Sequence, residues 1–531
     1  MTSSNAFTSP TTWNSKIIVL IQPSTLEGRL QSATMTMLLL LLPFIVCIFY
    51  FRFRNVFQPG WTSRRSLPTP KQPFWPLRLF HGPNGFEFER WSNEIAHEGV
   101  IRYFGALNEE RIFAISPRAV KDLLVSDAYK FVKPKLQFDL ASKVAARGLV
   151  LLEGQEHKHV RKCLLPAFKP AHMSRLPAIA WQCANTSGGR MAERIEDGKI
   201  KVLRELQNTF LETIGRWAYS TDLGALGEPQ SRIARLFTGA LRATKHGEKA
   251  FSLASVIVPQ AMMWLPTRAP KTLDHVASQI RQTCEELVVD RELKAQEKGL
   301  GEKTHHDLLD TLIASGELSH EHIVDETVHF LAAAGDMPAT LVSWVIHLLS
   351  RHPEVQNRLR SEVQKHLEDG KSPNELDGLP YLNAVIEETM RVHHLDTVLW
   401  REAAEEASLA GTPVHPGVKV VWSPWILNRN EEYWGSDADA FCPERWLEDA
   451  GEKRFSGYFS NATFGIGPRR CIGEQYARIT ARCMVASFVS RLEVAPVDSS
   501  SSTDVGMEIG SSPPVSFFKV LDGWELQAKA V

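Results

Sequence analysis

Apolar residues recur at intervals of three and four along much of this chain, which is typical of amphipathic helices. One such face is formed by Ile472, Tyr476, Ile479, Cys483 and Ala486. A longer helix is predicted to begin after Ser319, whose side chain can cap it, and to end before Pro353. Residues 170–315 also look mostly helical. Helices therefore dominate the expected fold.

Short β-rich segments interrupt this helical pattern. Val100–Phe104 and Ile112–Ile115 flank a polar turn and predict a hairpin. Val418–Trp422, after a Pro-Gly pair, predicts a further strand. The expected fold class is therefore mainly α with a small β region.

The N-terminal part of the chain differs in pattern from the rest. Residues 1–34 form a Ser/Thr-rich tail, and residues 35–51 are apolar and uncharged. This run is long enough to span a membrane, and Arg52 and Arg54 follow it, so the rest of the chain is expected on the cytosolic side. A cleaved signal peptide is the alternative. We expect a transmembrane anchor at 35–51, a Pro-rich hinge at 52–78 and one catalytic domain at 79–531.

Composition narrows the range of partners. The net charge is −1 and the sequence pI is near 7.0, which gives no indication of nucleic-acid binding. The seven cysteines are scattered, without metal-site spacing, and suit a reducing compartment.

The segment with the strongest chemical signal runs from Phe464 to Gly473. Gly465, Gly467 and Pro468 predict a tight loop that ends on Cys471, just before a helix. Free N–H groups and the helix dipole at that end, with two arginines beside the cysteine, predict a lowered thiol pKa. Such a thiolate can be a nucleophile, a redox centre or a metal ligand. No second Cys or His lies nearby for zinc, whereas a single axial thiolate suits haem iron.

The same segment resembles the haem-binding signature of the cytochrome P450 family, F-x-x-G-x-R-x-C-x-G. Phe464, Gly467, Arg469, Cys471 and Gly473 fill all its specified positions. The resemblance implies the cytochrome P450 fold around a buried haem b. It also implies that Cys471 is the iron ligand and that the other four residues bind the cofactor.

Two further sets of residues resemble motifs of this family. Glu388 and Arg391 match its E-x-x-R, and Arg445 lies in the matching Pro-Glu-Arg-Trp stretch. These three charges are expected to form a buried structural network that supports the haem loop. The haem propionates are expected to be held by His157, Arg161, Arg401 and Arg469.

The long helix predicted after Ser319 resembles the family helix that crosses the distal face of the haem. Asp336 takes the place of the usual acid, and Met337 stands where the family usually has Thr. Thr340 lies one turn after Asp336 and either replaces the missing hydroxyl in catalysis or bonds a backbone carbonyl of its own helix. Water or a substrate hydroxyl is the third possibility.

The resemblance implies a monooxygenase that inserts one atom of dioxygen into a lipophilic small molecule. An NADPH–cytochrome reductase is the expected electron donor, and the endoplasmic reticulum membrane the expected location, with a cytosolic catalytic domain. The general look is similar to fungal enzymes of secondary metabolism, such as those acting on terpenoids, polyketides or alkaloids. A haem-thiolate isomerase or dehydratase is the alternative, raised by Met337. A non-catalytic haem sensor is a second rival. The sequence does not identify the substrate.

Overall fold

A computed structural model provides the structure of the chain. It describes residues 66–72, 85–105, 108–135, 146–227, 231–237, 268–298, 307–447, 462–497, 516–517 and 524–531, and the single residues 43, 138 and 142. Contacts divide the chain into Met1–Trp61 and Thr62–Val531, and the fold below is that of the second unit.

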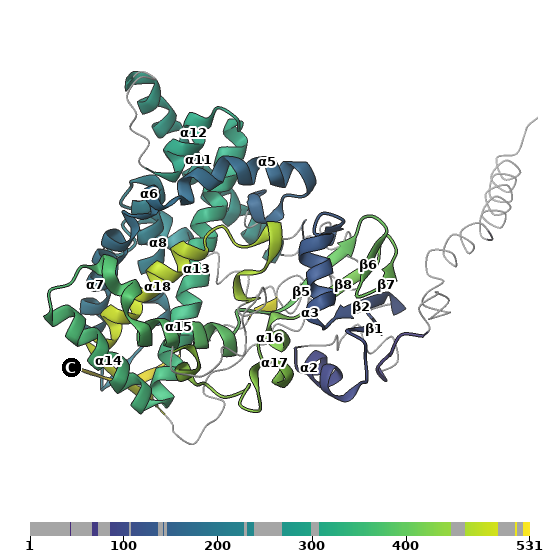
Figure 1. Ribbon diagram of the computed structural model, residues 1–531. Helices are drawn as coiled ribbons and strands as arrows, with labels where there is room; N and C mark the ends of the chain where they lie inside the picture. The colour runs from purple at the N-terminus through teal and green to yellow at the C-terminus, as the bar shows by residue number, and fades with distance from the viewer. Residues whose placement is uncertain are drawn as a thin grey trace, which may run out of the picture. The chain divides into compact units, whose positions relative to one another are not determined.

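The described part of this unit is mainly helical, as the sequence predicts (Figure 1). Its α-helices are α2 (Gly85–Glu94), α3 (Pro117–Lys121), α5 (Gly154–Leu164), α6 (Pro170–Met173), α7 (Leu176–Glu193), α8 (Leu203–Tyr219), α11 (Arg268–Lys298), α12 (Leu308–Ser315), α13 (His320–Arg351), α14 (Pro353–Glu368), α15 (Pro380–Val392), α16 (Pro424–Leu427), α17 (Glu431–Trp434) and α18 (Glu474–Val489). Shorter 3-10 turns are η4 (Leu149–Leu151), η5 (Leu165–Phe168), η6 (Pro373–Gly378), η7 (Pro443–Trp446), η8 (Ala462–Phe464) and η9 (Gly467–Arg469), and η3 (Asp122–Ser126) is a π-helix.

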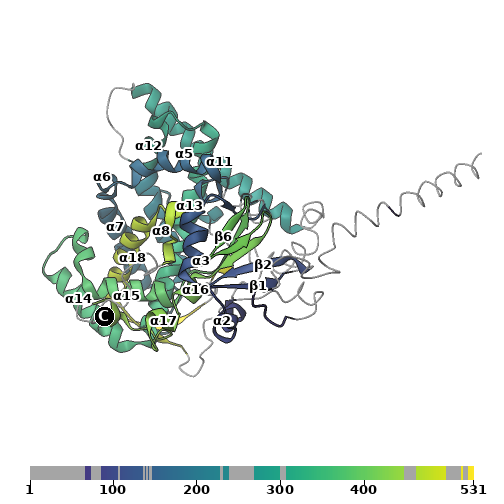
Figure 2. The ribbon, with the colours of Figure 1, turned by 45° about the vertical axis from the view of Figure 1, so that its right-hand side comes forward.

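Helix α13 is the central element of the helical part (Figure 2). Ser319 caps it by accepting a hydrogen bond from the His322 amide, and it ends just before Pro353, as predicted. It packs against α8, α11 and α18. Among the described helices, only α13 is long and apolar enough to cross a membrane, but 78% of its apolar window is buried inside the protein. It is therefore a core helix, and the anchor predicted at 35–51 lies outside the described residues except for residue 43.

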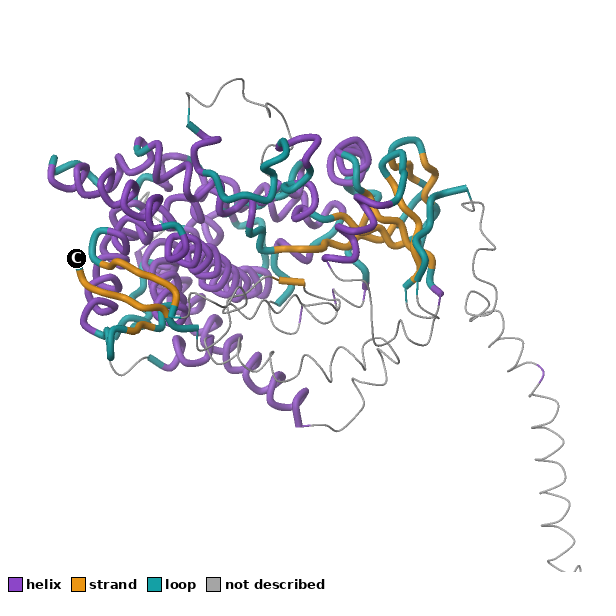
Figure 3. Tube along the Cα trace, turned by 90° about the horizontal axis from the view of Figure 1, so that it is seen from below, coloured by secondary structure: helices purple, strands orange, loops and turns teal. Residues whose placement is uncertain are grey.

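The strands form one larger sheet and two small ones (Figure 3). In the larger sheet the order is β1 (Val100–Phe104), β2 (Glu110–Ala114), β8 (Lys419–Trp422), β5 (Asp396–Ala403) and β10 (Ser516–Phe517), and β3 (Phe131–Val132) also pairs with β5. The predicted hairpin is β1 and β2, which pair antiparallel, while β2 and β8 pair parallel. The small sheets are β4 (Lys199–Ile200), β11 (Leu526–Ala530) and β9 (Leu492–Pro496), and the hairpin of β6 (Ala407–Leu409) and β7 (Thr412–Val414).

The buried hydrophobic residues form two cores. The larger core packs the helices together, with Trp344 of α13 and Phe488 of α18 among its fully buried side chains, and it also takes in strand residues such as Ile101 and Trp400. The smaller core lies between the β-sheet, α3 and η3, and includes Trp422 and Ile466. Ile466 belongs to the loop before α18, so this loop joins the β part to the helical part.

Candidate active site

The loop that ends on Cys471 is fixed by glycines and by contact with η3. Gly465 and Gly467 have positive φ angles of 69° and 74°, which favour glycine. A Cβ added to Gly467 would lie 2.2 Å from the Leu124 carbonyl oxygen, so a side chain does not fit there. The Cys471 amide donates to the Phe464 carbonyl oxygen at 2.8 Å and closes the loop. Sequence and packing together therefore set where Cys471 lies.

Cys471 itself is exposed and stands three residues before α18. Desolvation by the surrounding protein raises the pKa of its thiol and outweighs the Gly473 amide hydrogen bond and the charges of Arg161 and Arg470, which lower it. The lowered pKa expected from the sequence is therefore wrong for the thiol by itself. A bound metal cation deprotonates a coordinating thiol outright, so the thiolate form depends on the metal.

The three charges that match E-x-x-R and its partner arginine lie in direct contact. Arg391 forms a bidentate pair with Glu388 at 2.7 and 2.8 Å, and both side chains are fully buried. The Arg445 Nε donates to the same carboxylate at 2.9 Å. The Cys442 amide and the Trp446 indole add two more donors, at 2.9 and 2.8 Å. Glu388 thus accepts five hydrogen bonds.

Arg391 extends this network to the backbone. Its guanidinium donates to the carbonyl oxygens of Asn428, Ala438 and Ala440 at 2.8, 2.5 and 2.8 Å. Arg445 also donates to Asp437 at 3.1 Å. The network therefore holds the irregular segment that follows α16 against α15. This segment precedes the haem loop in the sequence. Sequence reasoning found the three charges and the Pro-Glu-Arg-Trp stretch, but it assigned no role to Trp446 and missed Asp437, which has no distinguishing spacing.

The residues predicted to hold propionates come together from three separate segments. We call Lys133, His157, Arg161, Arg401 and Arg469 the basic cluster. The pKa of Lys133 falls to about 7 because of burial and the charges of Arg401 and Arg469. The pKa of His157 falls to about 4 because of burial and the charges of Arg469, Lys133 and Arg161. Glu153 is the carboxylate that pairs with Lys133, at 3.2 Å, and with Arg469.

This basic cluster fits a dianionic group. Glu153 pairs with Lys133 and Arg469, and further positive charge acts on these buried positions, because Arg401 and Arg469 lower the pKa of Lys133. Like charges held together in partly buried positions favour an added counter-charge. The Arg469 Nε is buried without a hydrogen-bond partner among the described residues. The two propionates of the expected haem would supply both this counter-charge and the acceptors, and Cys471, the expected iron ligand, has an exposed side chain. Lys133 and Glu153 were missed from the sequence because nothing in the pattern around them indicates a site.

On α13, Asp336 and Thr340 lie one turn apart. The Thr340 hydroxyl donates to the Asp336 carbonyl oxygen at 3.0 Å, which is the internal helix bond that the sequence left open. The Asp336 carboxylate accepts from Gln207 of α8 at 3.0 Å and is buried. Pro338 lies inside the helix without ending it, and it offers no N–H to the Ala334 carbonyl. Gln207 was not anticipated, because it comes from a distant helix.

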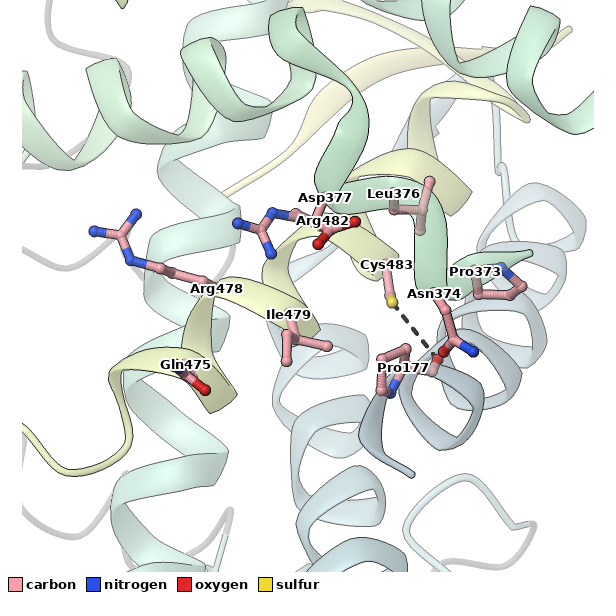
Figure 4. Close-up of a pocket in the computed structure, with 10 residues that line it drawn as sticks. All are labelled: Pro177, Pro373, Asn374, Leu376, Asp377, Gln475, Arg478, Ile479, Arg482 and Cys483. Carbon is pink, nitrogen blue, oxygen red and sulfur yellow. Dashed lines mark hydrogen bonds between the residues drawn. The ribbon is translucent and has the colours of Figure 1, made fainter. Parts of the chain in front are cut away.

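A cavity of about 330 Å³ lies on another face of α18 (Figure 4). Its charged groups are already paired, since Arg478 bonds to Glu387 and Arg482 donates to Asn383 at 2.6 Å. Cys483 closes one side by donating to the Pro177 carbonyl oxygen at 3.7 Å. None of the predicted site residues lines it, so it is separate from the site around Cys471. Its lining residues are Pro177, Pro373, Asn374, Leu376, Asp377, Gln475, Arg478, Ile479, Arg482 and Cys483.

A mainly helical fold, a cysteine on a glycine loop and a basic cluster beside it define the class of haem-thiolate proteins. Residues 84–517 match the model of the cytochrome P450 family, and the chain therefore belongs to that family. This confirms the fold class and the family resemblance, and the family is one of haem proteins.

Full-length relatives extend this assignment. The chain is 29% identical over 493 residues to cytochrome P450 monooxygenase sphH of Aspergillus fumigatus, covering 87% of this chain and 89% of the relative. It is 28% identical to cytochrome P450 monooxygenase FUM15 of Gibberella moniliformis, with coverages of 86% and 87%, and 28% identical to ALT8 of Alternaria alternata, with 89% and 90%. All three are named monooxygenases. The chain is an oxidoreductase of the monooxygenase type, and the isomerase or dehydratase alternative is not favoured.

Proposed function

We propose that this monooxygenase holds haem b through Cys471 and inserts one oxygen atom into a lipophilic small molecule of fungal secondary metabolism. The observation that carries the proposal is the exposed Cys471 sulfur on a rigid glycine loop next to the basic cluster. The fungal relatives support the metabolic setting. A terpenoid, a polyketide or an alkaloid has the required apolar character.

Each predicted cofactor residue has a place in this proposal. His157, Arg161, Arg401 and Arg469 hold the propionates, and Lys133 joins them as a further cation. The Phe464 carbonyl oxygen accepts a hydrogen bond from the Cys471 amide, and Gly467 lets the loop approach η3. Gly473 is assigned to the cofactor site as the last position of the signature. When bound, the haem supplies electron-transfer and dioxygen chemistry, and a thiolate ligand favours cleavage of the O–O bond.

The distal helix supplies proton transfer in this proposal. Asp336 is the proton carrier, and Gln207 orients its carboxylate through the hydrogen bond to Oδ1. Thr340 is assigned a supporting catalytic role through its hydroxyl, which is held on the Asp336 carbonyl oxygen. Because the Thr340 hydroxyl donates its proton to this carbonyl oxygen, it must rotate away from the carbonyl before it can pass a proton to another group.

Electrons and location complete the proposal. The described residues contain no motif for binding NADPH, so we assign electron delivery to a separate NADPH–cytochrome reductase. Residues 35–51 are proposed as a single-pass anchor in the endoplasmic reticulum membrane, with the catalytic domain in the cytosol. A membrane location brings a lipophilic substrate to the enzyme at high local concentration.

The first test is the carbon monoxide difference spectrum of reduced microsomes that carry the chain. The wild type and Cys163→Ala are expected to give the thiolate–carbonyl band, and Cys471→Ala to lose it. Lipophilic metabolites are then incubated with reductase, with and without NADPH, and analysed by mass spectrometry. An NADPH-dependent gain of one oxygen supports the proposal. A mass-neutral or water-loss product formed without NADPH would instead reinstate the isomerase or dehydratase.

A further inference from the structure

Tyr129 contacts the basic cluster although no motif marks it. It lies in the turn between η3 and β3 and is half-buried. Its hydroxyl oxygen is 3.2 Å from the Nδ1 of His157, and the two ring centroids are 5.8 Å apart. His157 is buried, and within the described part of the chain its other ring nitrogen, Nε2, has no hydrogen-bond partner. The ring is therefore held at one nitrogen and open at the other.

The surroundings of Tyr129 decide the direction of this hydrogen bond. The Nζ of Lys158 lies 4.3 Å from the centroid of the Tyr129 ring, and the guanidinium carbon of Arg469 lies 4.9 Å from it. Cations over an aromatic face draw electron density from the ring, which makes the phenol a better donor and a poorer acceptor. This polarisation favours the hydroxyl as the donor and the Nδ1 of His157 as the acceptor.

The charge state of His157 agrees with this direction. Burial and the positive charges of Arg469, Lys133 and Arg161 lower its pKa to about 4, which favours the neutral ring. A neutral imidazole has one N–H and one acceptor nitrogen. If Nδ1 accepts from Tyr129, the proton is on Nε2.

We propose that Tyr129 is a positioning residue that fixes His157 as the Nε2–H tautomer, so that Nε2 donates to a haem propionate. This inference rests on the proposed haem site. It also explains how histidine can occupy a position where the resembled family has Trp or His. An indole N–H is always a donor, whereas an imidazole is a donor at Nε2 only when its other nitrogen accepts.

Loss of the tyrosine hydroxyl would free His157 to place its proton on Nδ1. Nε2 would then present a lone pair to an anionic carboxylate, which is repulsive. Groups that orient a ligand-binding histidine typically affect affinity by 10–100-fold. We expect haem to dissociate about tenfold faster from Tyr129→Phe than from the wild type. Phenylalanine keeps the ring under Lys158 and Arg469, so this variant tests the hydroxyl alone.

The experiment measures haem transfer from the full-length holoprotein to excess apomyoglobin in detergent, followed by absorbance. Tyr129→Phe is made in the wild type and in His157→Trp, whose N–H needs no tautomer partner. We expect Tyr129→Phe to accelerate haem loss in the wild-type background. In the His157→Trp background, we expect it to leave the rate of haem loss unchanged. If His157→Trp does not retain haem, His157→Gln supplies a fixed amide donor in its place.

Two outcomes would overturn the inference. The first is a haem transfer rate that Tyr129→Phe leaves unchanged in the wild type. The second is an equal acceleration in both backgrounds, which would mean that Tyr129 acts by packing. The proposed haem site is tested separately by His157→Ala and Cys471→Ala. If His157→Ala retains haem like the wild type while Cys471→Ala loses the carbonyl band, the function stands and His157 has no propionate role.

Discussion

The substitution Glu388→Gln tests the buried network most directly, because it removes one charge and keeps the shape of the side chain. In all five of its hydrogen bonds the Glu388 carboxylate is the acceptor. Three of them reach Oε1 and two reach Oε2. A glutamine amide presents one oxygen and one NH2 group, so turning the amide over cannot satisfy both sides.

The size of the effect follows from this geometry. In either amide orientation at least two buried donors face the NH2 group, and each unsatisfied donor costs about 1–3 kcal/mol. Removing one partner from a buried ion pair typically costs about 3–5 kcal/mol. We therefore expect the free energy of unfolding to fall by about 3–5 kcal/mol for Glu388→Gln.

The assay is urea titration of the microsomal or detergent-solubilised protein, followed by loss of the thiolate–carbonyl band and by far-UV circular dichroism. The control is Asp369→Asn, which breaks an exposed pair with Lys371 at 3.2 Å and should change stability by less than about 1 kcal/mol. A wild-type urea midpoint and full haem content in Glu388→Gln would refute the account of the network given above.

The other predictions concern the loop, the distal helix and the sheet. Gly467→Ala places a Cβ 2.2 Å from the Leu124 carbonyl oxygen and should sharply lower haem content, whereas an alanine at an open surface glycine should not. Asp336→Asn should slow product formation and raise NADPH use per product more than Thr340→Ala does; equal wild-type coupling in both would exclude them as proton carriers. Although desolvation raises the pKa of Glu109, its arginine and lysine partners lower it to about 2. A group with a lowered folded-state pKa stabilises the fold at pH values above its unfolded pKa of 4.5, and this contribution is lost as the pH falls toward 2. Glu109→Gln should therefore have a lower urea midpoint than the wild type near neutral pH and the same midpoint near pH 2.

Much of the fold and several site contacts were predictable because they are encoded locally. The steps of three and four after Cys471 predict α18, and Ser319 and Pro353 mark the ends of α13. Glu388 and Arg391 are three residues apart on one helix, which places them within reach of each other. Residues three or four positions apart on a helix lie on the same face whatever the rest of the fold is, so such contacts can be predicted from the sequence.

What the sequence could not predict depends on groups that folding brings from far away. Tyr129 and Lys133 reach His157 from another segment, and neither residue lies in a periodic or motif-like context. The Cys471 thiol shows the same limit in its energetics. Counting neighbouring charges predicted a lowered pKa, but desolvation is set by the packed protein and raises it.

The reach of Arg391 has a consequence for the order in which the chain assembles. Its backbone acceptors come 37, 47 and 49 residues later, so the guanidinium has none of these partners while α15 emerges from the ribosome. Trp446, the last donor to Glu388, precedes Cys471 by a segment that takes about 1–5 s to synthesise. The ribosomal exit tunnel covers more residues than separate Trp446 from Cys471, so the network closes only after the cysteine loop has been synthesised. The network and the loop therefore become free to fold together, and cofactor capture is a late step in folding.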